Sequence, residues 1–211
     1  MIVSARGNLM AVLLGVIIFA GCGPGFQAGT DIDRGRQAMI MGNYQSALGY
    51  FQGAAQADPN YIWGTELREG VYSYLGRTQY LTGDLTQART TLERSLSLHK
   101  SDNLARLYLG LTLARQNDRK RGLQLIESGM KGIAAFINYI TSAFANDFGQ
   151  FWDNNNDIRN SIASNLQAIA KGNFDWPTLI ANGETIAMKF EREPDFANQQ
   201  EEQQMQMDLR R

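Results

Sequence analysis

Three short segments place serine beside lysine or asparagine at spacings that acyl-transfer chemistry uses. Ser97-Leu-His-Lys100 and Ser128-Gly-Met-Lys131 each put a lysine three residues after a serine, where its amine could accept the hydroxyl proton. Ser101-Asp-Asn103 follows the first of these directly, so two of the three segments share one predicted turn. Such motifs work only when separate elements bring them onto one substrate, and the chain contains no Lys-Thr-Gly segment. We therefore expect no acyl-transfer site.

A second segment has the alternating oxygen ligands with which a calcium-binding loop begins. Asp153, Asn155 and Asp157 occupy its first, third and fifth positions. The sixth position should be a glycine that turns the chain, and the twelfth a bidentate glutamate. Ile158 and Ser164 stand there instead. We interpret the segment as a helix cap, because short polar side chains satisfy the free N–H groups at a helix start.

Composition argues against several further classes of site. The chain of 211 residues has one histidine and one cysteine, which cannot form a disulfide or a structural zinc site. It has no Walker loop, no His-Glu-x-x-His segment and no dinucleotide fingerprint. We predict no catalytic residues, no metal and no cofactor. The net charge of −1, without any block of like charge, predicts no nucleic-acid partner.

The N-terminus has the layout of an export signal. Arg6 precedes a segment from Leu9 to Ala20 that is uncharged and almost wholly apolar, and Phe19-Ala-Gly-Cys22 follows. Twelve residues of helix span about 18 Å, too little for a bilayer core of about 30 Å. Phe19-Ala-Gly-Cys22 resembles the lipobox of bacterial lipoproteins, with Phe19 where leucine is usual. The alternative is an incidental cysteine in an ordinary signal or anchor helix.

The lipoprotein resemblance implies a boundary and a location. Residues 1–21 would be a signal peptide, Cys22 would carry a covalent lipid such as palmitate, and residues 22–30 would be the lipidated cysteine and a flexible tether. The lipid would hold the protein to a membrane of the bacterial cell envelope. Gly23 follows the cysteine, so no aspartate signals inner-membrane retention, and we expect the periplasmic face of the outer membrane.

Turn signals recur along the next hundred residues. They are Gly42-Asn43-Tyr44, Gly83-Asp84-Leu85 and Asn117-Asp118-Arg119, the last two of which lie 34 residues apart. This spacing, with a Leu-Gly pair before the turn and small and aromatic residues after it, resembles the tetratricopeptide repeat. The first copy (28–61) matches through Gly35, Gly42, Tyr44, Ala47, Phe51, Ala54 and Pro59. The second copy (69–102) matches through Leu75-Gly76, Gly83, Leu85, Ala88, Leu92 and Ser95, and Lys100 replaces its proline. The third copy (103–136) matches through Leu109-Gly110, Asn117, Gly122, Ile126 and Gly129, and Ala134 replaces its proline.

The resemblance implies an all-α fold, a short superhelix of about three helix-turn-helix repeats over 31–136 with additional C-terminal helices. We expect residues 62–68 to extend the next helix, which runs to Thr82. The stretch 134–152 reads as a phenylalanine-rich helix, and residues 155–171 and 177–191 as two more. Residues 137–194 would thus cap the array. The polar tail 195–211 lacks apolar periodicity, and we expect it to be disordered.

In tetratricopeptide arrays the first helix of each pair lines a concave groove that receives a peptide or partner helix. Carried over to this sequence, the groove positions are Arg36, Met39, Tyr74, Arg77, Tyr80, Leu107, Tyr108, Leu111 and Arg115. Arginines beside tyrosines suit a carboxylate or an acidic, partly aromatic peptide. The alternative is that the C-terminal helices fold back and fill the groove.

These expectations describe a lipid-anchored envelope scaffold or adaptor that binds other envelope proteins or peptides through its groove. Similar proteins serve outer-membrane protein assembly, pilus biogenesis or recruitment of peptidoglycan hydrolases, and the sequence does not choose among these processes. A second hypothesis is a structural protein that self-associates through helix 134–152 or the C-terminal tail, so the oligomeric state stays open. A third is a hydrolase whose site carries no familiar motif.

Overall fold

The structure is a computed structural model that describes residues 23–210, and these form an all-α fold, as the sequence predicts. The predicted signal peptide and the predicted lipidation site Cys22 lie outside the described residues. The described elements are α1 (Pro24–Ile40), α2 (Tyr44–Ala57), β1 (Ile62–Trp63), β2 (Glu69–Gly70), α3 (Val71–Leu81), α4 (Leu85–Leu98), α5 (Asn103–Arg115), α6 (Arg119–Ala143), the 3-10 turn η1 (Phe148–Phe151), α7 (Asp157–Ala170) and α8 (Trp176–Asp208).

Helices α1 to α6 form three consecutive hairpins, and the same local chemistry makes the turn in each. A residue in the left-handed region, Gly42, Gly83 or Asn117, ends the first helix with φ of 77°, 87° or 70°. The next residue, Asn43, Asp84 or Asp118, caps the second helix by accepting a hydrogen bond from the N–H three residues on. Each turn is therefore specified by two adjacent residues.

Close approach at glycine holds the two helices of a hairpin together. A Cβ atom on Gly35 of α1 would lie 2.5 Å from the Phe51 ring on α2, and one on Gly110 of α5 would lie 2.6 Å from the backbone nitrogen of Ile126 on α6. Phe51 and Ile126 are fully buried. Small residues on the first helix thus leave the space that large side chains of the second helix fill.

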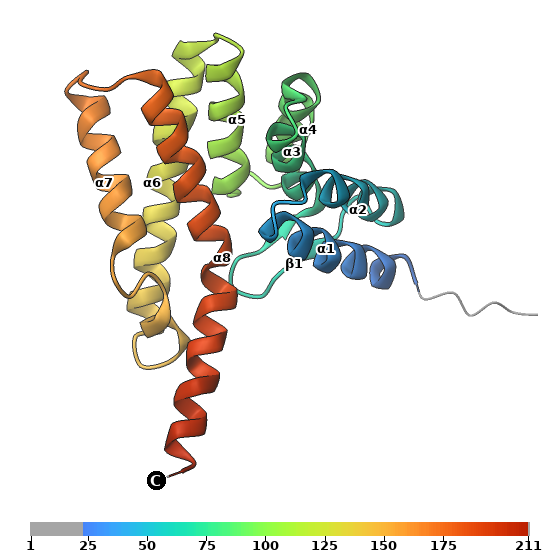
Figure 1. Cartoon of the computed structure of the whole chain (residues 1–211), viewed down its shortest axis with the longest axis vertical. Coiled ribbons are helices and arrows are strands. Elements are labelled where there is room, and N and C mark those ends of the chain that lie inside the picture. The colour runs from blue at the N-terminus through green and yellow to red at the C-terminus, as the bar shows by residue number, and fades with distance from the viewer. Residues whose placement is uncertain (1–22, 211) are drawn as a thin grey trace, which may run out of the picture.

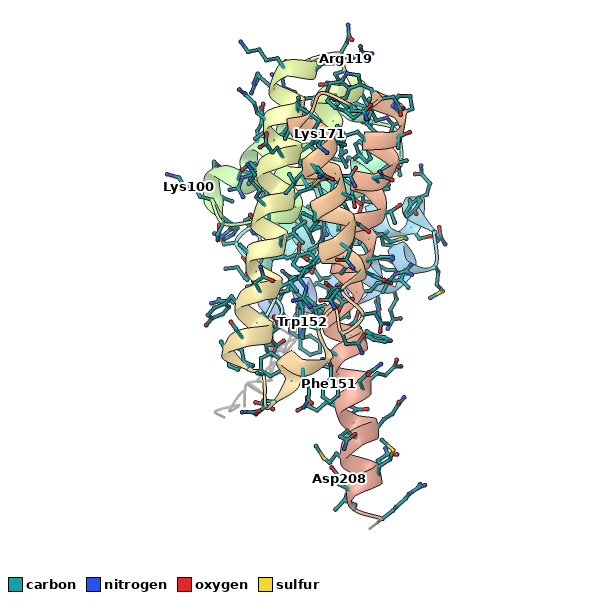
Figure 2. The ribbon with its side chains drawn as sticks, turned by 90° about the vertical axis from the view of Figure 1, so that its left-hand side faces the viewer. Lys100, Arg119, Phe151, Trp152, Lys171 and Asp208 are labelled. Carbon is teal, nitrogen blue, oxygen red and sulfur yellow. The ribbon has the colours of Figure 1, made fainter. Side chains whose placement is uncertain are left out.

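The last four helices run side by side, and α1–α4 lie to one side of them (Figure 1). Helix α8 packs against α5, α7 and η1, and it also reaches α1 and α3 through side-chain contacts given below. Its C-terminal turns project past the end of α6 and past Phe151 (Figures 1 and 2). The largest apolar core joins α3–α8, so the C-terminal helices share a core with the second and third hairpins.

Two predicted boundaries near the first hairpin are wrong. The tether predicted over 22–30 is helical over its described part, because Pro24 begins α1 and Ala28 is buried. Residues 62–68 do not extend a helix. Ile62 and Trp63 instead pair antiparallel with Gly70 and Glu69, and Gly64 between them has a φ of 93° that breaks the helix. Helix α3 consequently begins at Val71.

The boundary predicted between the third repeat and a phenylalanine-rich helix is also wrong. One helix, α6, runs over 25 residues from Arg119 to Ala143. No turn residue interrupts it, and a buried apolar stripe continues across the expected boundary through Met130, Ile133, Ile137 and Ile140. Residues 148–151 form the separate turn η1.

The tail predicted to be disordered is helical to Asp208. Helices predicted over 155–171 and 177–191 are present as α7 and α8, but α8 continues far beyond Glu191. Packing holds the helix as far as the buried Ala197, and the Gln, Glu and Met residues that follow are good helix formers, so the helix propagates from an existing nucleus.

Candidate functional site

Helix α8 packs on the side of the hairpins that carries the predicted groove residues. Arg36 of α1 forms an ion pair with Asp195 at 2.8 Å, and Arg77 of α3 forms one with Glu191 at 3.1 Å. The Tyr80 hydroxyl donates a hydrogen bond to Glu184. The C-terminal helix α8 therefore folds back onto predicted groove residues, the contact that the second alternative from the sequence describes.

The predicted groove residues pack against α8 and also against other helices, since Tyr74 stacks on Phe51 of α2 and Leu107 lies against Gly129 of α6. Arg36, Met39, Tyr74, Arg77, Tyr80, Leu107, Tyr108 and Leu111 are all buried, and Arg115 is exposed. Gly183 of α8 crosses α5 so closely that a Cβ there would lie 2.8 Å from Leu111. The two arginines expected to bind an acidic ligand already bind acidic side chains of the same chain.

Arg77 is the centre of a buried charge cluster. Its side chain is completely buried and lies between Glu69 of β2 at 3.2 Å and Glu191 at 3.1 Å, while its Nε donates to the Ser73 carbonyl. Burial raises the pKa of Glu69 from 4.5 to about 7, although the positive charge of Arg77 acts to lower this pKa. The cluster is sealed from solvent, so it joins β2, α3 and α8 structurally.

Arg36 makes a second connection to α8. Its guanidinium lies 3.8 Å from the centre of the Trp63 ring, donates to Asp195 and also reaches the Glu191 carbonyl. The Trp63 indole in turn donates to Asp33 at 2.7 Å. The short hairpin at 62–70, which the sequence did not predict, therefore supplies both Trp63 and Glu69 to the junction with α8.

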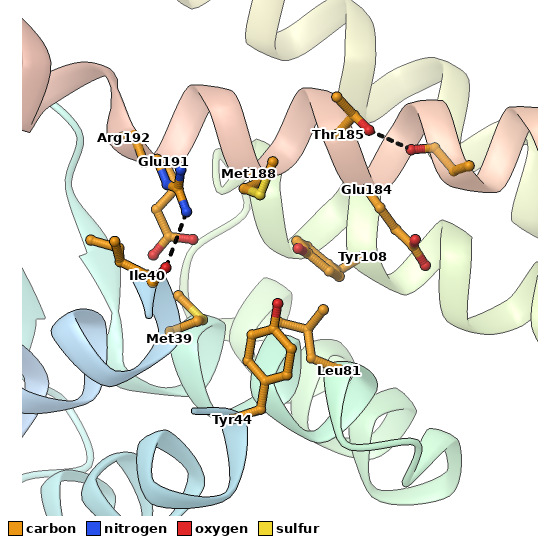
Figure 3. A pocket seen from close by; sticks show the side chains of 11 residues that line it. Met39, Ile40, Tyr44, Leu81, Tyr108, Glu184, Thr185, Met188, Glu191 and Arg192 are labelled. Atoms are coloured by element: carbon orange, nitrogen blue, oxygen red, sulfur yellow. Dashed lines mark hydrogen bonds between the residues drawn. The ribbon is translucent and has the colours of Figure 1, made fainter. Parts of the chain in front are cut away.

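Beside α8, the packed helices leave a cavity of about 320 Å³. It lies between the end of α1, the start of α2, the end of α3, and α5 and α8 (Figure 3). Its lining residues are Met39, Ile40, Tyr44, Leu81, Tyr108, Ala181, Glu184, Thr185, Met188, Glu191 and Arg192. Only Met39 and Tyr108 belong to the predicted groove. Ile40, Tyr44 and Leu81 lie on α1, α2 and α3, and the other six residues lie on α8, whose path the repeat pattern does not encode.

The walls of this cavity combine apolar and hydrogen-bonding groups. Met39 and Leu81 face Met188 across it (Figure 3), and Met188 is 44% exposed, so the apolar wall is open to solvent. Among residues 23–210, the hydroxyls of Tyr44 and Tyr108 form no hydrogen bond. Burial raises the pKa of Tyr108, which keeps its hydroxyl protonated and able to donate. The cavity can hold an apolar group with a polar end.

The motifs that resemble catalytic sites have local structural roles. Asp153 caps α7, since its two carboxylate oxygens accept from the N–H groups of Ile158 and Arg159 at 2.8 and 3.1 Å. The cap predicted for residues 153–157 is thereby confirmed. The Ser97 hydroxyl donates to the Arg94 carbonyl in the same helix, α4.

The described part of the chain offers neither a metal site nor a membrane span. Within residues 23–210, no three His, Cys, Asp or Glu side chains lie close enough together to hold a metal ion. None of the helices over this range is long and apolar enough to cross a bilayer. Comparisons of the chain with family models, curated proteins and solved structures found no significant match.

Proposed function

We propose that the chain is a lipid-anchored scaffold or adaptor of a bacterial cell envelope, built on a tetratricopeptide-like superhelix. Two kinds of local feature support this assignment in all three hairpins. The turns share a left-handed residue followed by a capping Asn or Asp, and each first helix carries a glycine in contact with the second helix. The lipobox-like segment ending at Cys22 supports the anchor and the envelope location.

One observation carries the proposal for binding, namely the open cavity at the junction of α1, α3, α5 and α8. Elsewhere on the concave face, α8 covers the predicted binding residues with a shared core, and displacing it would expose Leu179, Ile186 and Phe190. Exposing three such side chains costs on the order of 5 kcal/mol. A partner therefore binds more favourably at the cavity, beside α8, than in place of α8.

The experiment that tests this proposal is crosslinking in living cells. A photoreactive phenylalanine derivative replaces Ile40 or Met188, which line the cavity and are 40% and 44% exposed. The control position is Lys100 (Figure 2), an exposed residue in the turn between α4 and α5 that does not line the cavity. We expect the same discrete crosslinked product from Ile40 and Met188 and none from Lys100.

A cavity-filling variant provides the second control. Ala181 is an exposed residue of the lining, so Ala181→Trp places an indole in the cavity without altering the core. This variant should abolish the crosslinked product while the protein stays folded by circular dichroism. A product that also forms from Lys100, or that survives Ala181→Trp, contradicts partner binding at this site.

A second candidate function is self-association through the end of α8. Met205, Met207 and Leu209 are 59%, 53% and 83% exposed on the turns that project beyond the other helices. The alternative surface in residues 134–152 is less suitable, because Phe136, Phe144, Phe148 and Phe151 pack against the core. Sedimentation of the full chain in detergent tests this candidate: an oligomer that becomes a monomer in Leu209→Glu favours it, and a monomer at micromolar concentration contradicts it.

A further inference from the structure

The two segments that the sequence offers for self-association meet at one end of the folded chain. The loop after α6 and the last turns of α8 border a cleft of about 370 Å³, the terminal cleft. Phe151 of η1 is half-buried, with one part against the core and another part lining this cleft. Met205 and Leu209 of α8 line it as well, on turns that extend past Phe151 (Figure 2). The two segments therefore form one surface.

One face of α8 supplies a wall of the terminal cleft and leaves apolar side chains exposed. Four lining residues have the spacing i, i+3, i+4, i+7 of a single helical face, namely Glu201, Gln204, Met205 and Asp208. Met205 and Leu209, one turn apart, are 59% and 83% exposed. Helices in water gain most of their stability from the packing of an apolar face, so burial of these side chains against another surface would stabilise the end of α8.

The charges at this end of the chain are complementary to those of a second copy. Among residues 23–210, the charged residues of the cleft lining are all acidic: Asp147, Glu201 and Asp208. Gln204 donates to Asp208, whereas the carboxylates of Asp147 and Glu201 have no ion pair or hydrogen-bond donor in this range. Arg210, at the tip of the same helix, is exposed and has no acidic partner there either. A guanidinium has five N–H donors, so one Arg210 can serve both free carboxylates of another copy.

A two-fold arrangement brings tip and cleft together in register. Antiparallel helices that cross at Met205 place residues equally distant from Met205 opposite each other. Glu201 lies four residues before Met205 and Arg210 five residues after it, about 6 and 7.5 Å along the helix. Arg210 of one copy therefore lies within about 1.5 Å of the level of Glu201 of the other.

We propose that two copies of the chain associate through the terminal cleft as a symmetric dimer, an inference that rests on the second candidate function. Met205 packs on its equivalent at the symmetry axis, and Leu209 enters the cleft of the other copy beside Phe151. The same contact brings Arg210 to the free carboxylates of that cleft. None of the residues that line the cavity of about 320 Å³ takes part, so each copy keeps that site.

A cysteine at the symmetry axis tests the geometry. Met205→Cys places a thiol opposite its own equivalent, and mild oxidation of the full chain should give a covalent dimer on a non-reducing gel. Met207→Cys is the control, because Met207 is 53% exposed but does not line the cleft, and it should give little dimer. The unsubstituted chain, whose one cysteine is Cys22, gives the background. Equal yields from the two variants overturn the proposed axis.

Reversal of the proposed ion pair tests the contact between tip and cleft. Sedimentation of the full chain in detergent, with micelles in excess, measures the Kd of the dimer. Arg210→Glu should raise this Kd about tenfold, because two equivalent attractive pairs become repulsive. Adding Glu201→Arg should restore the Kd to within about threefold, whereas adding Glu202→Arg, at an exposed position outside the lining, should not. Circular dichroism establishes that all variants are folded.

The outcomes distinguish this interface from self-association itself. A chain that stays monomeric at micromolar concentration contradicts both. A dimer that Arg210→Glu does not weaken, or that Glu202→Arg restores as well as Glu201→Arg does, overturns the terminal cleft as the interface while self-association through another surface stands. Restoration by Glu201→Arg alone supports the proposed dimer.

Discussion

The ion pair between Arg77 and Glu191 connects α8 to α3, and its removal tests how α8 is held in place. Glu191→Gln preserves the size of the side chain and an oxygen that can accept from Arg77, but it removes the negative charge. The side chains of Arg77 and Glu191 are 0% and 9% exposed, so water cannot replace the lost charge. The perturbation therefore acts on electrostatics with little change in packing.

The magnitude follows from burial. Breaking a buried ion pair by removing one partner costs about 3–5 kcal/mol, and because Glu69 still contacts Arg77 we expect the lower value, about 3 kcal/mol. For a chain of this size, about 3 kcal/mol lowers the melting temperature by roughly 6–12 °C. Glu184→Gln is the control on the same helix. Its side chain is 37% exposed, so it should cost less than about 1 kcal/mol.

The assay is urea denaturation followed by circular dichroism, supported by thermal melts. A double-mutant cycle with Arg77→Met isolates the interaction, because the second substitution should cost much less once the first has removed the pair. The reasoning is refuted if Glu191→Gln destabilises the protein no more than Glu184→Gln, or if the two effects in the cycle simply add. Either result would mean that α8 is not held to α3 by this contact.

Three further predictions concern other parts of the chain. Folding raises the pKa of Glu69 from 4.5 to about 7, so the folded state binds this proton more tightly and the free energy of unfolding should fall as pH rises through that interval. Urea titrations of the unmodified chain at pH 5 and pH 8 should therefore differ by on the order of 2 kcal/mol, and in Glu69→Gln this difference should disappear. Gly110→Ala puts a Cβ 2.6 Å from the Ile126 backbone and should cost about 2 kcal/mol, whereas Gly49→Ala, with open space around it, should be neutral or stabilising in the same melts. Cys22→Ser should abolish labelling of the protein in cells by an alkyne fatty acid, and retained labelling would place the lipid elsewhere.

The hairpins could be predicted because their causes are local. A left-handed glycine or asparagine followed by an Asn or Asp cap is readable from two adjacent residues, and the small residues that permit close packing recur at the same positions. The contact between Gly35 and Phe51 joins residues of one hairpin. Such short-range determinants lie within a single repeat, so pattern and structure agree on them.

The boundaries predicted between hairpins were less successful, because neighbouring elements decide them. Residues 62–70 form a β-hairpin since Gly64 breaks the helix and Trp63 packs on Arg36, a residue of α1. The end of α8 is helical although its sequence is polar, because a packed segment nucleates it. Neither the β-hairpin nor the helical end of α8 could be predicted from the local amino-acid composition.

The sequence by itself determined the helical class and the three turns, and it singled out residues of the first helices that include Arg36 and Arg77. Only the tertiary structure decided what those residues contact, because α8 lies far along the chain and has no repeat pattern that relates it to Arg36 or Arg77. Glu191 and Asp195 are paired with these arginines, so the chain itself supplies the acidic groups that Arg36 and Arg77 were expected to bind in a ligand. The charge displayed by these helices is therefore a property of the folded chain, since pairing between distant residues cancels the charges that the local pattern displays.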